Sequence, residues 1–230
     1  MTVIEEFENE LIKNGLTTEN LAGYEKLLKR VRGNDMRLEH CCITALRFPL
    51  NRSEDALSLI KWGLEKYPPD SWFAAYRVYY TEGMICERCG RYQSAYEAYS
   101  KAYNALSDEQ AAYRRATAGD LLWMRLHIDG FGYSEELERY YDLFRETDDI
   151  QKSFINNEFR LCVARIVIFR HKEMTEEARR SYEKALMLCG PDAVSRMKDI
   201  LDKHGAEDVL TVTPECSAFL KSVNAWNLEL

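Results

Sequence analysis

A pattern of small and aromatic residues with helical spacing recurs five times along this chain of 230 residues. From each reference position, a tyrosine or isoleucine follows four residues later, and small or apolar residues follow seven and eight residues later. Successive reference positions lie 36, 39, 41 and 42 residues apart. A recurrence of this length is typical of stacked helical hairpins, in which each hairpin buries its apolar face against its neighbours. The reference positions are Asn20, Ala56, Ala95, Glu136 and Ala178; the residues four positions later are Tyr24, Ile60, Tyr99, Tyr140 and Tyr182; the pairs that follow are Leu27 and Leu28, Gly63 and Leu64, Ala102 and Tyr103, Leu143 and Phe144, and Ala185 and Leu186.

Composition and charge restrict the class of protein. Hydrophobic residues make up 46% of the chain and charged residues 30%, which is ordinary for a soluble globular protein. No apolar run approaches the roughly 20 residues that cross a bilayer, and the acidic start lacks the features of a secretory signal, so we expect a cytoplasmic protein without membrane contact. A net charge of −7 argues against nucleic acid as a partner. The seven cysteines show no disulfide framework and are expected to be reduced thiols.

Proline and glycine positions divide the chain into helices and leave no stretch with strand periodicity, so the predicted fold class is all-α. Asn14 and Gly15 break the first pair, Gly90 breaks the third, and Asn51 or Ser53 is the expected cap of the fourth helix. We expect residues 1–190 and 191–230 to form one continuous unit, an array followed by capping helices at 191–204 and 213–225. The predicted pairs cover residues 2–14 and 17–32, 35–48 and 52–67, 70–88 and 91–106, 108–129 and 133–147, and 150–171 and 174–188.

The third pair resembles a tetratricopeptide repeat in its small and aromatic residues, which are Tyr79, Gly83, Gly90, Tyr92, Ala95, Tyr99 and Ala102. The second pair resembles the repeat through Ala56, Ile60, Gly63, Leu64 and Pro68, and the fifth through Ala178, Tyr182 and Ala185. The resemblance implies a right-handed superhelix of about five stacked antiparallel hairpins with C-terminal capping helices. Two features depart from the family pattern. Every interval exceeds the usual length of about 34 residues, and glutamates occupy a small position (Glu136) and an apolar position (Glu82).

The resemblance also implies a ligand groove, because the first helix of each repeat lines the concave face of such an array. Arginine is frequent among the corresponding residues, and its guanidinium suits carboxylates, so an acidic or C-terminal peptide is one candidate partner. The alternative is that these arginines are solvated or paired within the protein. The family's asparagine clamp is absent, since Val163, Ala164 and Val167 occupy its places. The groove candidates are Arg77, Tyr80, Met84 and Arg88 in the third pair, Leu121, Arg125 and Asp129 in the fourth, and Arg160, Val163, Arg170 and His171 in the fifth.

Aromatic residues are dense at the start of the third pair, where Trp72 and Phe73 are followed by Tyr76, Tyr79 and Tyr80. Most tyrosines of the chain recur at helical spacing and are expected to fill space between helices. This group is denser than packing requires, and aromatic anchors commonly dominate binding energy. Trp72 and Tyr76 are therefore further candidates for contact with a partner.

Signals for chemistry are weak. Cys86 and Cys89 form a lone CxxC without the additional ligands that zinc requires, so we expect structural thiols and no metal site. The four histidines lack metal-ligand spacing, and no glycine-rich phosphate loop occurs. We expect no catalytic residues and no cofactor, and an enzyme is the least favoured class.

Two binding functions follow from this reading. The first is a non-enzymatic adaptor that holds a protein or peptide in the groove of a helical array. The alternative is a regulatory peptide sensor, or an inhibitor of the immunity-protein type that binds a folded partner. The sensing parts of some bacterial transcription regulators are similar in architecture, but they usually carry an N-terminal DNA-binding motif. Residues 1–34 offer two helices and no basic recognition helix.

Overall fold

The computed structural model describes residues 3–146 and 155–189. Every regular element in these two ranges is a helix, which confirms the all-α class for the described part of the chain. The chain divides into two compact units, Met1–Ile128 and Asp129–Leu230. The capping helices predicted at 191–204 and 213–225, and the predicted division at residue 190, lie outside the described residues.

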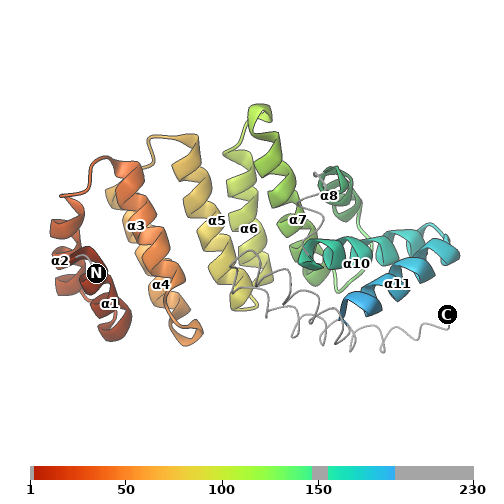
Figure 1. The fold of residues 1–230 in the computed structure, drawn as a ribbon, viewed down its shortest axis with the longest axis horizontal. Helices are drawn as coiled ribbons and strands as arrows, with labels where there is room; N and C mark the ends of the chain where they lie inside the picture. Colours follow the sequence, from red (N-terminus) through yellow and green to blue (C-terminus); the bar gives the residue numbers. More distant parts are fainter. Residues whose placement is uncertain (1–2, 147–154, 190–230) are drawn as a thin grey trace, which may run out of the picture. The chain divides into compact units, whose positions relative to one another are not determined.

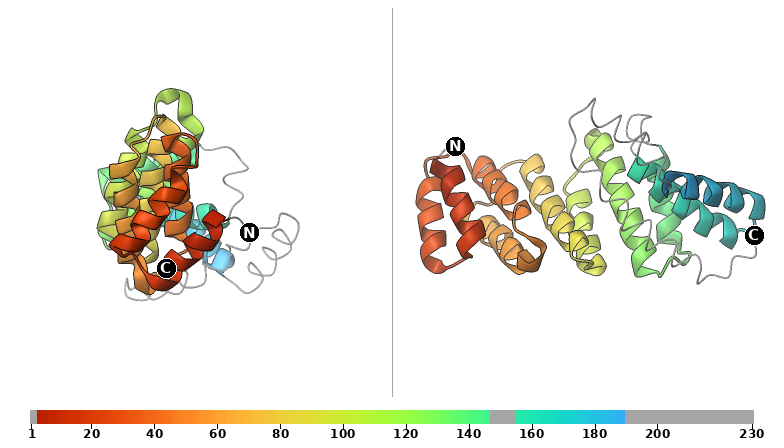
Figure 2. Two further views of the ribbon diagram at one scale, coloured as in Figure 1. Left: turned by 90° about the vertical axis from the view of Figure 1, so that its left-hand side faces the viewer. Right: turned by 60° about the horizontal axis from the view of Figure 1, so that its bottom comes forward.

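The first unit is a row of helices that succeed one another in chain order (Figures 1 and 2). Helix α3 contacts α4 and α5, α5 contacts α4 and α6, and α6 contacts α7. Each helix end lies within about four residues of its predicted position. The seven α-helices are α1 (Val3–Asn14), α2 (Thr18–Leu28), α3 (Asn34–Leu46), α4 (Ser53–Lys66), α5 (Trp72–Arg88), α6 (Tyr92–Asn104) and α7 (Ala111–Ile128), and short 3₁₀ turns at Leu50–Arg52 and Asp108–Gln110 precede α4 and α7.

Glycine and capping residues explain where these helices end. Gly15 and Gly90 have φ angles of +94° and +69°, a left-handed conformation that a side chain disfavours, so the chain reverses at both as predicted. Ser71 caps α5 by accepting a hydrogen bond from the backbone N–H of Ala74. The predicted cap of α4 is wrong. Its N-cap is Arg52, without a side-chain hydrogen bond, and Ser53 is already helical because a 3₁₀ turn leads into the helix.

The recurring small and large residues pack against each other in the first unit. Tyr24, Ile60 and Tyr99 are at most 2% exposed. A Cβ atom added to Gly83 would lie 2.6 Å from the ring of Tyr99, and one added to Gly63 would lie 3.1 Å from the Cβ of Cys41. These glycines therefore allow the close approach that the repeated pattern predicted.

A buried carboxylate holds α1 to the helices that follow it. Glu8 is 2% exposed, and its Oε1 accepts a hydrogen bond from the hydroxyl of Tyr24, 3.1 Å away. The same oxygen lies 3.0 Å from Nδ1 of His40, and Nη1 of Arg47 donates to Oε2 over 3.3 Å. The Tyr24 hydroxyl also lies 3.1 Å from Oγ1 of Thr44. This network joins α1, α2 and α3 and satisfies a charge that would be costly to bury alone.

The second unit contains α8 (Glu135–Arg145), α10 (Ile155–His171) and α11 (Thr175–Cys189) among its described residues. Helix α10 packs against both α8 and α11 (Figure 1). Ser134 caps α8 by accepting from the N–H of Leu137, after a turn in which Gly130 and Phe131 both have positive φ angles. The two helices of the fourth predicted pair therefore belong to different units, α7 to the first and α8 to the second.

Candidate functional site

Three large aromatic side chains form an exposed cluster in the first unit. Trp72 and Phe73 begin α5, Tyr113 lies in the first turn of α7, and each of the three is 42% exposed. Their ring centroids are 5.6 Å apart for Trp72 and Phe73, 5.8 Å for Trp72 and Tyr113, and 6.2 Å for Phe73 and Tyr113. The rings meet edge to face, an arrangement that aromatic pairs favour. We call Trp72, Phe73 and Tyr113 the aromatic cluster.

Helix starts position this cluster. The Ser71 cap places Trp72 and Phe73 in the first turn of α5. A capping box formed by Ser107 and Gln110 fixes the 3₁₀ turn before α7, and so determines where Tyr113 emerges. Because the three side chains lie in the first turn of their helices, no preceding turn covers them. The rings therefore pack against one another, and part of their surface is exposed.

Packed rings support the cluster from within the unit. Tyr76 is 6% exposed, and its centroid lies 5.3 Å from those of both Tyr113 and Tyr80. Burial raises the pKa of Tyr76 to about 12, in keeping with a hydroxyl held away from water. The hydroxyl of Tyr80 donates to Oδ2 of Asp120 over 2.9 Å. The cluster therefore stands on an ordered base, and a partner would not have to order that base on binding.

Three of the arginines predicted to line the groove lie in the first unit, and each contacts another residue of that unit. Both Nε and Nη2 of Arg77 donate to Glu39, over 3.3 and 2.7 Å. Nη1 of Arg88 donates to the carbonyl oxygen of Leu46 over 3.1 Å. The guanidinium of Arg125 lies over the ring of Tyr96 at 5.5 Å. Met84 lies half-buried on α5 between Arg77 and Arg88.

Asp129 and the groove candidates of the fifth pair lie in the second unit. Arg160 is half-buried on α10, while Arg170 and His171 are exposed at its C-terminal end. The imidazole of His171 stacks on the ring of Tyr133, with centroids 3.6 Å apart. The expectation that Leu121 and Val163 line an exposed groove is wrong, because the side chains of both are completely buried in their units.

Buried thiols do not form a reactive centre in the described residues. Cys41, Cys42, Cys86 and Cys162 are buried. Burial raises the pKa of Cys42 to about 12 and that of Cys86 to about 11, so neither thiol is a nucleophilic thiolate at neutral pH. Within the described ranges, no three residues of the types His, Cys, Asp and Glu come together as metal ligands.

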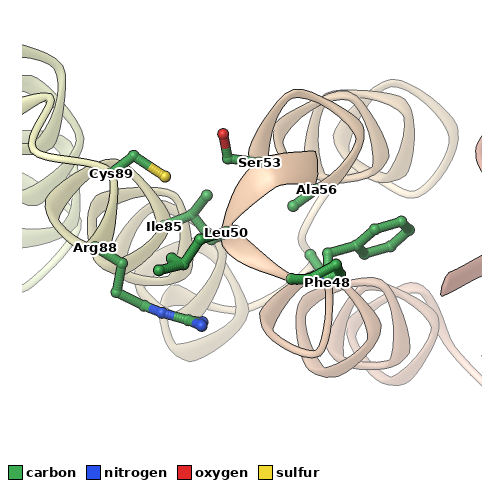
Figure 3. Close-up of a pocket in the computed structure, with 9 residues that line it drawn as sticks. Phe48, Leu50, Ser53, Ala56, Ile85, Arg88 and Cys89 are labelled. Atoms are coloured by element: carbon green, nitrogen blue, oxygen red, sulfur yellow. The ribbon is translucent and has the colours of Figure 1, made fainter.

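A small pocket lies where the end of α5 meets the turn between α3 and α4 (Figure 3). Its volume of about 10 Å³ is close to the minimum for one water molecule, so it fits no metabolite. In the view of Figure 3 the side chains of Leu50 and Ile85 lie close together, between Cys89 and Arg88. The lining residues are Ala45, Phe48, Pro49, Leu50, Ser53, Ala56, Ile85, Arg88 and Cys89.

Comparison with known proteins returns no match to a protein-family model, to a curated protein or to a solved structure. None of the helices in the described ranges has the length and apolar character needed to span a bilayer. The aromatic cluster is therefore the feature on which a functional argument rests. Sequence reasoning identified Trp72 but missed Tyr113. The available signal was its position, because both aromatics lie in the first turn of a helix and a few residues after a capping serine, Ser71 for α5 and Ser107 for the 3₁₀ turn before α7.

Proposed function

We propose that this protein is a non-enzymatic docking module that binds a protein or peptide partner through the aromatic cluster. The observation that carries the proposal is the shared exposure of three adjacent rings, each 42% exposed, on two different helices. Isolated exposed apolar residues are common on protein surfaces, whereas rings gathered on an ordered base are typical of binding sites. Trp and Tyr also contribute large contact areas and lose little side-chain entropy on binding.

We further propose that the helices form an array like that of the tetratricopeptide-repeat family, with about five hairpins and C-terminal capping helices. The close approach at Gly83 and the burial of Ala95 and Tyr99 support this proposal, since these residues carry the family resemblance. In such an array α5 and α7 are first helices of successive repeats. The aromatic cluster would then lie at one end of the wall that faces the ligand.

The geometry weakens the case for an acidic partner. Arg77 already binds a carboxylate of the protein with two donors, and Arg88 is hydrogen-bonded to a backbone carbonyl. A partner carboxylate would have to compete for these groups. Contact through aromatic surface needs no such exchange.

The proposal is tested by replacing the cluster and following the capture of partners. Trp72→Ala combined with Tyr113→Ala should abolish a set of interactions that the wild type shows in cross-linking from its native host. The matched control is Met36→Ala combined with Leu50→Ala, because both residues are 55% exposed apolar side chains of the same unit and lie outside the cluster.

The control should retain every interaction that the cluster variant loses. Equal losses in the two variants, or unchanged capture by a correctly folded cluster variant, would contradict the proposal. The size of the captured species separates an adaptor or inhibitor, which binds a folded protein, from a sensor, which binds a short peptide.

A further inference from the structure

We infer that the aromatic cluster recognises a basic segment, with lysine or arginine side chains of the partner lying against its exposed rings. This inference rests on the proposed docking function and adds the chemistry of the partner. It follows from three observations: the acidic residues that flank the cluster, the pairing of the nearby arginines, and the use of ring faces by cations elsewhere in the same unit.

Carboxylates lie just before each of the two helices that carry the cluster. Asp70 is exposed and precedes Trp72 by two residues. Glu109 is exposed in the 3₁₀ turn before α7 and precedes Tyr113 by four residues. A partner segment that extends from the rings past the start of either helix would meet these carboxylates. An apolar or acidic partner would leave them unpaired at a cost, whereas ammonium or guanidinium groups would pair with them.

The protein's own cations near the cluster are largely neutralised. Arg77 forms an ion pair with Glu39, 2.7 Å away, and Arg114 forms one with Asp108. Arg115, which is half-buried, is the remaining cation on the first two turns of α7. The paired Arg77 and Arg114 therefore add little positive charge at the cluster, and the net charge of −7 does not oppose a basic partner.

Ring faces in the first unit already serve as cation sites. Arg114 lies over Tyr103 at 4.6 Å, Arg52 over Phe48 at 5.1 Å and Arg37 over Tyr67 at 5.5 Å. Such contacts are favourable within about 6 Å of the ring centroid, and tryptophan is the strongest partner. Among the described residues, no cation of the protein occupies a ring face of the aromatic cluster. Each of the three side chains keeps 42% of its surface exposed, so a partner's cations can reach the cluster.

The test uses three synthetic nine-residue peptides in which glycine alternates with arginine, glutamine or glutamate. Binding to the full chain is measured by calorimetry and by NMR chemical-shift changes, at low and at high salt. The arginine peptide should bind at least about tenfold more tightly than the glutamine peptide, shift resonances of the cluster, and weaken as salt screens the carboxylates. The glutamate peptide should not bind at the cluster.

Two variants separate the contributions of ring and charge. Trp72→Leu keeps apolar volume but removes the ring, and should weaken the arginine peptide about fivefold. Asp70→Asn combined with Glu109→Gln should weaken it by a similar factor and reduce its salt dependence. The charge-matched control is Glu19→Gln combined with Glu65→Gln, two exposed glutamates on α2 and α4, which should leave binding unchanged.

The outcomes distinguish this inference from the proposed function. Equal or tighter binding of the glutamine or glutamate peptide at the cluster would overturn the basic-partner inference while leaving the docking function in place. So would arginine-peptide binding that is insensitive to both variants. If the cross-linking experiment also shows no dependence on Trp72 and Tyr113, the docking function itself is overturned.

Discussion

Two contacts between helices in the first unit are built on different principles. Between α5 and α6, small residues meet a large ring, with Ala95 completely buried and Gly83 facing Tyr99. Between α1 and its neighbours, a buried carboxylate is surrounded by hydrogen-bond donors from α2 and α3. Close packing tolerates no added volume, whereas a polar network tolerates changes in volume but not the loss of a partner. The comparison predicts different sensitivities to mutation at the two contacts.

The largest effect is expected at the packed contact. Ala95→Glu would place a charge at a position that is 0% exposed on α6, next to the α5 contact. Burying an unpaired carboxylate and overfilling the site should together cost about 4 kcal/mol or more. Circular dichroism should show a melting temperature lowered by about 10 °C or more. An unchanged melting temperature would show that α6 does not pack through Ala95.

A matched control comes from the same helix. Ser94 immediately precedes Ala95 and is exposed. Ser94→Glu introduces the same side chain one residue away and should change stability by less than about 0.5 kcal/mol, because surface substitutions away from special features are usually mild.

The second effect tests the polar contact. Glu8→Gln retains the shape of the side chain but removes the charge that faces His40 and Arg47, and should cost about 1–2 kcal/mol. The loss is limited because the side chains of His40 and Arg47 are 29% and 39% exposed, so solvent screens their attraction to Glu8. Hydrogen exchange should show lost protection in α1 with little change in α5 and α6.

Glu10→Gln is the control for this prediction, since Glu10 is an exposed residue on the same helix. It should leave the protection of α1 unchanged. Equal effects of the two substitutions would mean that Glu8 contributes only through the helix's overall charge.

Two substitutions at Tyr24 separate the two principles within one side chain. Tyr24 is completely buried and fills space as the repeat pattern predicts, but its hydroxyl also joins Glu8 to Thr44. Tyr24→Phe keeps the ring and removes the hydroxyl, so it should cost about 1 kcal/mol. Tyr24→Ala removes the ring as well and should cost at least about 3 kcal/mol in chemical denaturation. Similar losses for the two variants would show that the hydroxyl, and not packing, dominates at this position.

The sequence predicted the packed contact well and the polar one poorly. Local signals such as Gly15 and Gly90 predicted the helix ends. The spacing of small and large residues predicted which side chains pack between helices. Glu8 was hidden among Glu5, Glu6 and Glu10, which are all exposed. A signal did exist, because Glu8 lies four residues after Ile4 and three before Leu11, on the apolar stripe of its helix.

The candidate site was predicted only in part, for a related reason. Spacing can place Arg77 on the first helix of a repeat, but its pairing with Glu39 depends on a contact between helices whose members lie 38 residues apart. The same applies to Tyr113, which reaches Trp72 and Phe73 only once α5 and α7 have been brought together. The sequence pattern predicts which face of a helix a residue occupies. The contacts of that face depend on tertiary packing, which the pattern does not specify.

The smallest effect concerns Arg77, where the arginine interpretation of the groove can still be tested. Its ion pair with Glu39 is partly exposed, with the two side chains 33% and 28% exposed, and such pairs contribute little to stability. Arg77→Met keeps much of the aliphatic contact and should change the free energy of unfolding by less than about 1 kcal/mol. If the aromatic cluster is the docking surface, Arg77→Met should also leave partner capture intact, in contrast to Trp72→Ala. Loss of capture at unchanged stability would instead place Arg77 in the binding surface and return the acidic partner to consideration.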